Sequence, residues 1–436
     1  MTKVSIASLG CAKNLVDTEG MLGIITQNGL EIVDDESIAD VIIINTCCFI
    51  NDAKQESIDT IIELAKWKID GQCKRLIVTG CMAQRYRDEI IKELPEVDAV
   101  VGVGSISDIM SVINSGENNV LCDKEYSHIT SERIRTTPAY SAYLKIADGC
   151  DNHCTYCVIP SIRGRYISRT IEDIVKEAEN LAKTGVKELI IIAQDSTNYG
   201  MDIYNEVRLC ELLNKLCEID GIKWVRLHYC YPERITDELI DTIANNEKIC
   251  NYIDIPIQHC NDDILKKMGR RGNKAQLIDV ITKLRAKIPD ITIRTSLITG
   301  FPTETDDQFG ELEKFVEEMK FDRLGIFMYS QEEETVAAEM DGQIDEDVKR
   351  NRLEMLMFAQ AEVAEEISNS KIGQILTVLV EDYDPLIKQH FGRSVADSID
   401  IDGKVFFKSK ERIPAGEFIE VTIEEAMDYD LFGTVN

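Results

Sequence analysis

Three cysteines, Cys150, Cys154 and Cys157, have the spacing CxxxCxxC, which is the sharpest chemical signal in the chain. Their thiolates can ligate three irons of a cubic 4Fe-4S cluster. No fourth cysteine follows at comparable spacing. The fourth iron would therefore accept a ligand from outside, as the open position of a catalytic zinc site does. A zinc site completed by His153 is the alternative metal centre, and the spacing leaves it open.

A second trio of cysteines is spread over the first part of the chain. Cys11, Cys47 and Cys81 each follow a predicted strand, at 4–9, 41–44 and 75–79. The carboxyl ends of parallel strands lie at one edge of a sheet, so we expect the three thiols to converge there. Such a site suits another Fe–S cluster. The alternative is that all three are buried cysteines that pack as small apolar residues.

The first trio lies in a region of alternating strands and helices. The predicted strands are 142–147, 188–193, 224–228, 252–257, 292–298 and 323–327. This alternation indicates βα repeats. The region is short for a closed eightfold barrel, so we expect a partial, TIM-like (β/α)6 barrel.

The chain divides into three expected domains of the α/β class with a small all-β tail. Residues 1–120 predict an open parallel α/β sheet, residues 136–368 the partial barrel, and residues 371–436 a small antiparallel β-barrel. A polar stretch at 118–137 predicts a linker. Residues 345–370 have the pattern of one amphipathic connecting helix.

Composition restricts the partners. With 48 Lys and Arg against 78 Asp and Glu, the net charge is −30, which disfavours nucleic acid and favours a basic partner or simply solubility. No apolar run is long enough to cross a membrane, and the start of the chain lacks the layout of a signal peptide, so we expect a cytoplasmic protein. In that compartment the 14 cysteines are not expected to form structural disulfides.

Several polar residues fall at the ends of the predicted barrel strands. They are Gln194, Asp195, His228, Gln258 and Tyr329. Barrel enzymes place their sites at this end, so each is a candidate site residue. A capping or turn role is the alternative for any one of them. We assign Asp195 and Tyr329 to the wall that faces the substrate.

The cysteine motif, with Tyr156 before the last cysteine, resembles the signature of the radical S-adenosylmethionine (SAM) superfamily. The resemblance implies that SAM binds the open iron and is cleaved to a 5′-deoxyadenosyl radical. Residues 299–304 (TGFPTE) resemble the glycine-bearing segment beside SAM in this superfamily. That segment often has the sequence GFPGET in relatives, so Thr303 stands at the position of its second glycine. The cofactor-binding residues expected from this resemblance are Tyr156, Gln194, His228, Gln258 and Gly300.

The combination of both cysteine trios and the β tail resembles the methylthiotransferases along nearly the full chain. In that family the first domain holds a second 4Fe-4S cluster and the tail is a TRAM domain. The resemblance implies two 4Fe-4S clusters, ligated by Cys11, Cys47, Cys81 and by the first trio. SAM then serves both as radical source and as methyl donor.

Two branches of this family compete. One modifies an adenosine of transfer RNA, and the other an aspartate of the small-subunit ribosomal protein S-twelve. Residues 8–17 (SLGCAKNLVD) and 392–397 (GRSVAD) look like the ribosomal-protein branch. The tail holds seven Lys and Arg against 13 Asp and Glu, whereas an RNA-binding tail should be basic.

The expected product is therefore 3-methylthioaspartate in ribosomal protein S-twelve, with flavodoxin or ferredoxin as the type of reductant. Nucleic acid is not the expected substrate. The alternatives are an isopentenyl-adenosine transfer RNA methylthiotransferase and, from another class, a non-catalytic Fe–S electron carrier.

Overall fold

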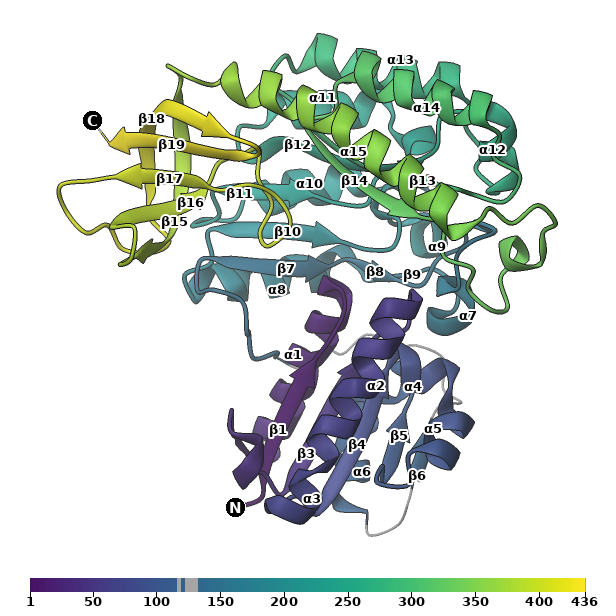
Figure 1. Cartoon of the computed structure of the whole chain (residues 1–436). Helices are drawn as coiled ribbons and strands as arrows, with labels where there is room; N and C mark the ends of the chain where they lie inside the picture. Colours follow the sequence, from purple (N-terminus) through teal and green to yellow (C-terminus); the bar gives the residue numbers. More distant parts are fainter. Residues whose placement is uncertain (116–118, 122–131, 436) are drawn as a thin grey trace.

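The computed structural model describes residues 1–115, 119–121 and 132–435, and it is built around three large sheets that follow one another along the chain (Figure 1). The expected fold class is confirmed: an N-terminal parallel sheet, a central partial barrel and a small C-terminal barrel. Most of the expected linker lies outside the described residues. Among the described helices, none combines the length and apolar composition that a membrane crossing requires.

The N-terminal sheet has six parallel strands in the order β2-β1-β3-β4-β5-β6. Its strands are β1 (Lys3–Ser8), β2 (Glu31–Ile32), β3 (Val41–Thr46), β4 (Arg75–Gly80), β5 (Ala99–Val101) and β6 (Asn119–Leu121). The helices are α1 (Ala12–Gln27), α2 (Asn51–Ala65), α3 (Trp67–Asp70), α4 (Cys81–Arg85), α5 (Arg87–Glu93) and α6 (Ile109–Asn114). β3 and β4 are buried along their whole length, which explains their apolar runs. The sequence did not predict β2, β5 or β6, because two or three residues carry too little periodicity.

The central sheet is parallel, in the order β14-β13-β12-β11-β10-β7, and does not close on itself. Its strands are β7 (Ser141–Lys145), β10 (Glu188–Ile192), β11 (Trp224–Leu227), β12 (Ile249–Gln258), β13 (Thr292–Thr299) and β14 (Arg323–Met328), beside the short pair β8 (Ala147–Asp148) and β9 (Ile167–Ser168). These are the six predicted strands, with shifted ends. The helices are α7 (Ile159–Arg163), α8 (Ile171–Lys183), α9 (Met201–Tyr204), α10 (Leu209–Cys217), α11 (Asp237–Asn245), α12 (Asp262–Lys267), α13 (Lys274–Lys287) and α14 (Asp306–Met319).

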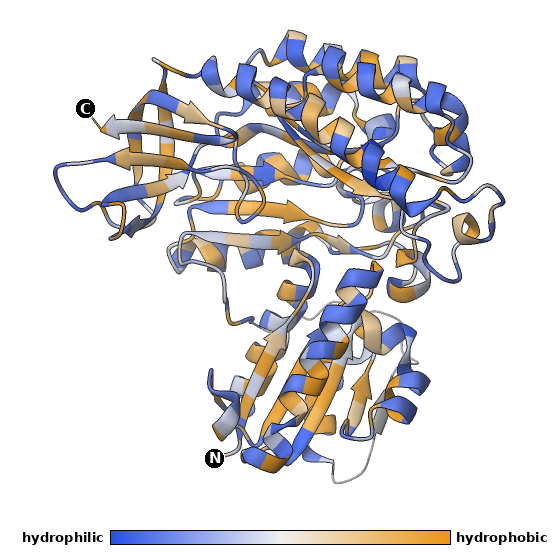
Figure 2. Cartoon of the chain, viewed as in Figure 1, coloured by the Kyte–Doolittle hydropathy of each residue, from blue (hydrophilic) through white to orange (hydrophobic). Residues whose placement is uncertain are grey.

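Helix α15 (Glu346–Asn369) crosses the outside of the central domain to the tail (Figure 1). It corresponds to the connecting helix predicted at 345–370. The outward faces of the helices are largely hydrophilic, whereas the sheet strands are largely hydrophobic (Figure 2). Alternate residues of β10 illustrate the division. Leu189 and Ile191 pack under the helices, and Glu188, Ile190 and Ile192 point to the opposite face, which lines the lumen of the partial barrel.

The C-terminal barrel is closed, in the order β15-β16-β17-β19-β18. Its strands are β15 (Ile375–Asp384), β16 (Gln389–Arg393), β17 (Val405–Lys408), β18 (Phe418–Met427) and β19 (Asp430–Val435). One detail differs from the expected antiparallel barrel: β17 and β19 pair in parallel. The parallel pair closes the barrel between two strands that are not neighbours in sequence.

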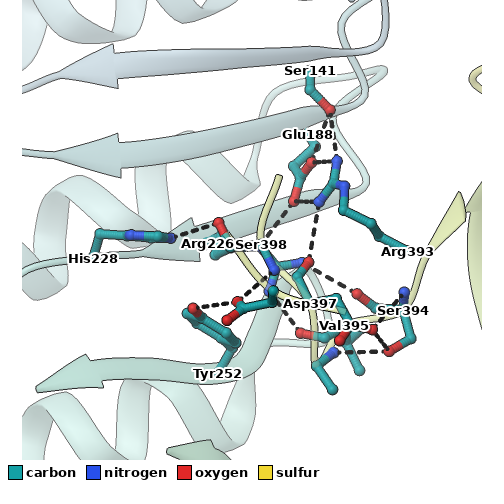
Figure 3. Close-up of polar contacts among 12 residues, drawn as sticks. Ser141, Glu188, Arg226, His228, Tyr252, Arg393, Ser394, Val395, Asp397 and Ser398 are labelled. Atoms are coloured by element: carbon teal, nitrogen blue, oxygen red, sulfur yellow. Dashed lines mark hydrogen bonds and ion pairs between the residues drawn. The ribbon is translucent and has the colours of Figure 1, made fainter. Parts of the chain in front are cut away.

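The loop between β16 and β17, residues 394–404 and hereafter the tail loop, enters the lumen of the central barrel (Figure 3). Arg226 Nη1 donates to the Val395 carbonyl at 2.7 Å, and the His228 Nε2 and Ser398 Oγ atoms lie 2.9 Å apart. Tyr252 donates to Asp402 at 2.8 Å. The tail loop thus contacts polar side chains that project into the lumen of the central barrel.

Candidate active site

The structure places Cys11, Cys47 and Cys81 at the carboxyl ends of three neighbouring strands, β1, β3 and β4. Cys11 is the N-cap of α1, and Cys81 is the first residue of α4. The thiol of Cys81 is near enough to those of Cys11 and Cys47 to interact with them electrostatically. The residues that the sequence proposed as one set of ligands therefore meet at one sheet edge.

Two glycines allow this meeting. A Cβ atom on Gly10 would lie 2.7 Å from the Cβ and 2.9 Å from the Sγ of Cys47, and Gly10 has φ +83°. A Cβ atom on Gly80 would lie 2.3 Å from Asn45 Oδ1, at φ +92°. Both positions demand glycine, because other residues would clash and would be strained at positive φ. The glycines before Cys11 and Cys81 thus bring the backbone close enough for the thiols to gather.

The trio Cys150, Cys154 and Cys157 lies in the loop between β8 and α7. Cys150 and Cys154 are buried and Cys157 is half-buried. The thiol of Cys157 interacts with both of the others. Backbone amides face two of the sulfurs, since Asn152 N lies 3.4 Å from Cys150 Sγ and Ile159 N lies 3.5 Å from Cys157 Sγ. Amide donors of this kind stabilise a thiolate.

Burial raises the pKa of four of these thiols, those of Cys47, Cys81, Cys150 and Cys157. It raises the pKa of Cys157 to about 12 and that of Cys81 to about 11. Iron would replace the proton, as metals do on coordinating thiols. No three Cys, His, Asp or Glu side chains of the described residues are arranged around one metal ion. In a 4Fe-4S cluster each thiolate ligates a different iron, so the donor set of each trio fits a cluster.

A buried ion network joins the two cysteine regions. Arg163, at the end of α7, donates to Asp17 of α1 at 3.0 Å, to Asp148 at 2.7 Å and to Asn14 Oδ1 at 3.0 Å. Lys145 of β7 pairs with the same two carboxylates, Asp17 and Asp148. Burial alone would raise the pKa of Asp148, but Arg163 and Lys145 hold it well below its ordinary value. Asp148 is therefore ionised, and the two domains are tied by ion pairs as well as by packing.

Asp195 lies against the cysteine loop. Its carboxylate accepts from Asn152 Nδ2 at 2.9 Å, from Thr197 Oγ1 at 2.6 Å and from Arg234. Asn152 also faces the sulfur of Cys150. Asp195 is buried, so in this structure it braces the loop. Its contact with a substrate stays a prediction.

Among the buried polar atoms at the barrel mouth that have no partner within the described residues are two acceptors. They are Gln194 Oε1, just after β10, and Thr299 Oγ1, at the end of β13. The other end of the Gln194 side chain donates to Asp148 Oδ1 at 2.8 Å. Because unpaired buried polar atoms are costly, both are suited to hydrogen bonds with a polar ligand such as SAM.

Three non-glycine residues at the mouth have left-handed backbones: Tyr229, Gln258 and Thr303, with φ of 59°, 76° and 69°. Such backbone strain is concentrated at functional sites in proteins. Thr303 has a backbone conformation that favours glycine, in line with the resemblance of this segment to GFPGET. Its amide donates to the Gly342 carbonyl at 2.8 Å, which helps to hold that conformation.

The remaining predicted site residues are spread around the lumen. Tyr156 packs in one apolar cluster with Phe301 and Tyr329. Gly300 lies against α15, where a Cβ atom would be 2.4 Å from Lys349 Cγ. His228 contacts the tail loop, as described above. The structure thus places Tyr156 and Tyr329 together, and it places His228 and Gly300 against neighbouring domains and helices; their ligand roles stay predictions.

Comparison with known proteins decides the family. Residues 3–102 match the uncharacterized protein family UPF0004, residues 144–316 the radical SAM superfamily and residues 372–435 the TRAM domain. The ribosomal protein uS12 methylthiotransferase RimO of Lachnoclostridium phytofermentans is 52% identical over 99% of both chains. The chain belongs to the RimO family of radical SAM methylthiotransferases. The RimO of Clostridioides difficile (strain 630) is 49% identical over 100% of this chain and 99% of its own.

Solved structures share the fold at much lower identity. The radical SAM methyltransferase TsrM of Kitasatospora setae aligns with a TM-score of 0.56 at 14% identity, covering 75% of this chain and 73% of its own. The cobalamin-dependent radical SAM enzyme OxsB aligns with a TM-score of 0.53 at 14% identity, over 82% of this chain and 56% of its own. RimO enzymes use radical SAM chemistry, and this fold supports the 4Fe-4S cluster and SAM as cofactors.

Sequence reasoning missed the residues that join the two cysteine regions. In the sequence, only a family-like stretch draws attention to Lys13, Asn14 and Asp17. Nothing in the sequence analysis points to Lys145 or Arg163. A signal was present, because Lys13 and Asp17 lie one helical turn apart in α1. Both are buried against the central barrel, and the Lys13 ammonium lies 3.4 Å from the ring centroid of Tyr229.

Proposed function

We propose that this chain transfers a methylthio group to an aspartate side chain of the small-subunit ribosomal protein uS12, giving 3-methylthioaspartate. The observation that carries the proposal is the pair of cysteine trios on either side of one buried ion network. Each trio offers three thiols, so each cluster would keep one iron open. One site would bind SAM and the other would hold the sulfur to be transferred.

When bound, SAM and the reduced cluster supply a radical able to remove hydrogen from an unactivated carbon. The chain supplies the rest. Cys150, Cys154 and Cys157 hold that cluster, with Asp195 and Asn152 bracing the loop. Gln194 and Thr299 offer free acceptors to SAM. Cys11, Cys47 and Cys81 would hold the second 4Fe-4S cluster, and the interface at Arg163 keeps the two close.

The choice of a protein substrate rests on names and charge. The full-length relatives are named for uS12, and the chain carries a net charge of −30. An acidic surface attracts a basic ribosomal protein and repels RNA. We further propose a reductant of the flavodoxin or ferredoxin type, and reaction in the cytoplasm, where ribosomes are found.

The test is an anaerobic assay of reconstituted enzyme with SAM, dithionite and sulfide, offering purified uS12, whole small subunits or transfer RNA. We expect uS12 to gain the mass of one methylthio group at an aspartate. The Cys47→Ala variant should lose this product, and Cys48→Ala is the matched control. Modified transfer RNA with unmodified uS12 would reverse the substrate assignment. Failure to cleave SAM despite intact clusters would favour an electron carrier.

A further inference from the structure

Arg163 lies at the junction of the two cysteine regions. It ends α7, the helix that follows the Cys150–Cys157 loop, yet its guanidinium reaches into the N-terminal domain. It is almost completely buried, with 2% of its surface exposed. Its neighbour Ile162 packs in the same apolar cluster as Cys81 and Met82. The position is therefore rigid and dry.

The charge of Arg163 acts on all three N-terminal thiols, Cys11, Cys47 and Cys81. Arg163 is the first of the neighbouring charges that lower the pKa of Cys81 against the effect of burial. Two carboxylates, Asp17 and Asp148, hold the guanidinium from the other side. These contacts fix the orientation of the guanidinium group, because its N–H donors all lie in one plane.

We propose that Arg163 is the outer-sphere cation of the N-terminal cluster: it raises the reduction potential of that cluster and fixes it against the Cys150–Cys157 loop. This inference rests on the proposed second cluster. Reduction adds one negative charge to a cluster, and a buried cation beside the ligand thiolates stabilises the more negative state. Net charge and hydrogen bonds to sulfur are established determinants of Fe–S potentials.

Lys145 provides a matched comparison. It pairs with the same two carboxylates, Asp17 and Asp148, and is equally buried. However, the strongest electrostatic effects on the thiols of Cys11, Cys47 and Cys81 include that of Arg163 and do not include that of Lys145. Loss of Lys145 therefore disturbs the same interface without removing the cation nearest the thiols. The pair of variants separates an effect on the cluster from an effect on domain docking.

The experiment uses the full chain with Cys150, Cys154 and Cys157 changed to alanine, so that only the N-terminal cluster remains. Iron analysis comes first, followed by a redox titration monitored by electron paramagnetic resonance. Arg163→Met should lower the ratio of reduced to oxidised cluster about tenfold at the wild-type midpoint, a shift of about 59 mV for a one-electron couple. Arg163→Lys should recover most of the ratio, and Lys145→Met should leave it within about threefold of wild type.

The double variant Arg163→Met with Asp17→Asn keeps the buried charges balanced if the single variant does not fold. It should still show a loss of reduced cluster, smaller than that of Arg163→Met because a buried negative charge is removed as well. Equal midpoints in wild type and in the Arg163 variants, or an equal shift in Lys145→Met, would overturn the role of Arg163 and leave the proposed function standing. A triple-alanine chain that binds no iron would instead overturn the second cluster itself.

Discussion

At the scale of single residues, adjacent cysteines have opposite roles. Cys47 belongs to the N-terminal trio, whereas Cys48 is fully buried, and burial raises its pKa to about 12. Cys48 packs with Ile42, Ile44 and Val78, as a small apolar residue does. The Cys47 side chain lies against Gly10, whereas the Cys48 side chain packs in the apolar cluster.

This contrast predicts iron content. Anaerobically reconstituted wild type should hold about eight irons per chain, and Cys47→Ala about four, because one cubane is lost. Cys48→Ala should keep about eight. Iron and labile-sulfide analysis measures this directly. Equal iron in Cys47→Ala and wild type would remove Cys47 from the ligand set.

Thr303 gives a second prediction at this scale. A β-branched residue at φ +69° is strained, and Thr303→Gly relieves that strain while making the unfolded chain more flexible. We expect a net gain in the free energy of unfolding of up to about 1 kcal/mol. The control is Thr305→Ala, which removes the N-cap of α14 and should cost about 1 kcal/mol. Thermal unfolding of both variants beside wild type is the measurement, and a clear loss in Thr303→Gly would contradict the strain.

At the scale of elements, the tail loop and the central barrel are interdependent. Glu188 of β10 accepts from Arg393 of β16 at 2.6 Å, from Arg226 of β11 at 2.9 Å and from Ser141 of β7 at 2.8 Å. Burial alone would raise the pKa of Glu188, but the two arginines lower it to about 2. Three central strands and the tail are thus joined by one ionised carboxylate (Figure 3).

Breaking this network should release the tail. Arg393→Met leaves Glu188 short of a buried partner and should cost about 3–5 kcal/mol. The matched control is Lys187→Met, which breaks the exposed pair of Lys187 with Glu417 between the same two domains and should cost less than about 1 kcal/mol. Chemical denaturation and limited proteolysis near residue 371 give the readout. Similar stability in the two variants would show that the buried network does not dock the tail.

At the scale of the whole molecule, three domains meet inside one barrel lumen. Val16 of α1 and Ile399 of the tail loop pack in one cluster with Ile190 and Ile192 of β10. This apolar cluster therefore joins residues of all three domains inside the barrel.

His228 makes this assembly sensitive to pH. Burial lowers its pKa from 6.5 to about 4, so the folded protein holds the neutral ring against Ser398. The unfolded chain takes up the proton near pH 6.5, and the folded chain only near pH 4. The stabilisation by the neutral ring is therefore complete above pH 6.5 and is lost as the pH falls toward 4, by up to about 3 kcal/mol.

The measurement is the free energy of unfolding between pH 7 and pH 4. His228→Gln keeps a hydrogen-bonding side chain but cannot titrate. Its free energy of unfolding should therefore fall less steeply with decreasing pH than that of wild type, with a slope that corresponds to about one proton fewer taken up on unfolding. Parallel curves for the two proteins would mean that His228 does not titrate below its ordinary pKa.

The sequence by itself determined the fold class, the six central strands and the two cysteine trios. These features are local: apolar strands, glycines before Cys11 and Cys81, and the CxxxCxxC loop are legible without a partner element. The ends of parallel strands must share an edge, so even the gathering of Cys11, Cys47 and Cys81 could be predicted.

Only the tertiary structure decided which distant residues share buried charge. Arg163, Lys145 and Asp17 come from three separate elements, and Glu188 meets Arg393 across 205 positions of sequence. No periodicity marks such pairs, because each partner looks like an ordinary exposed charge until folding removes the water around it. The structure also shows that Asp195 contacts Asn152 of the cysteine loop, a contact that residue type alone does not reveal, and its predicted place in the wall facing the substrate stays a prediction.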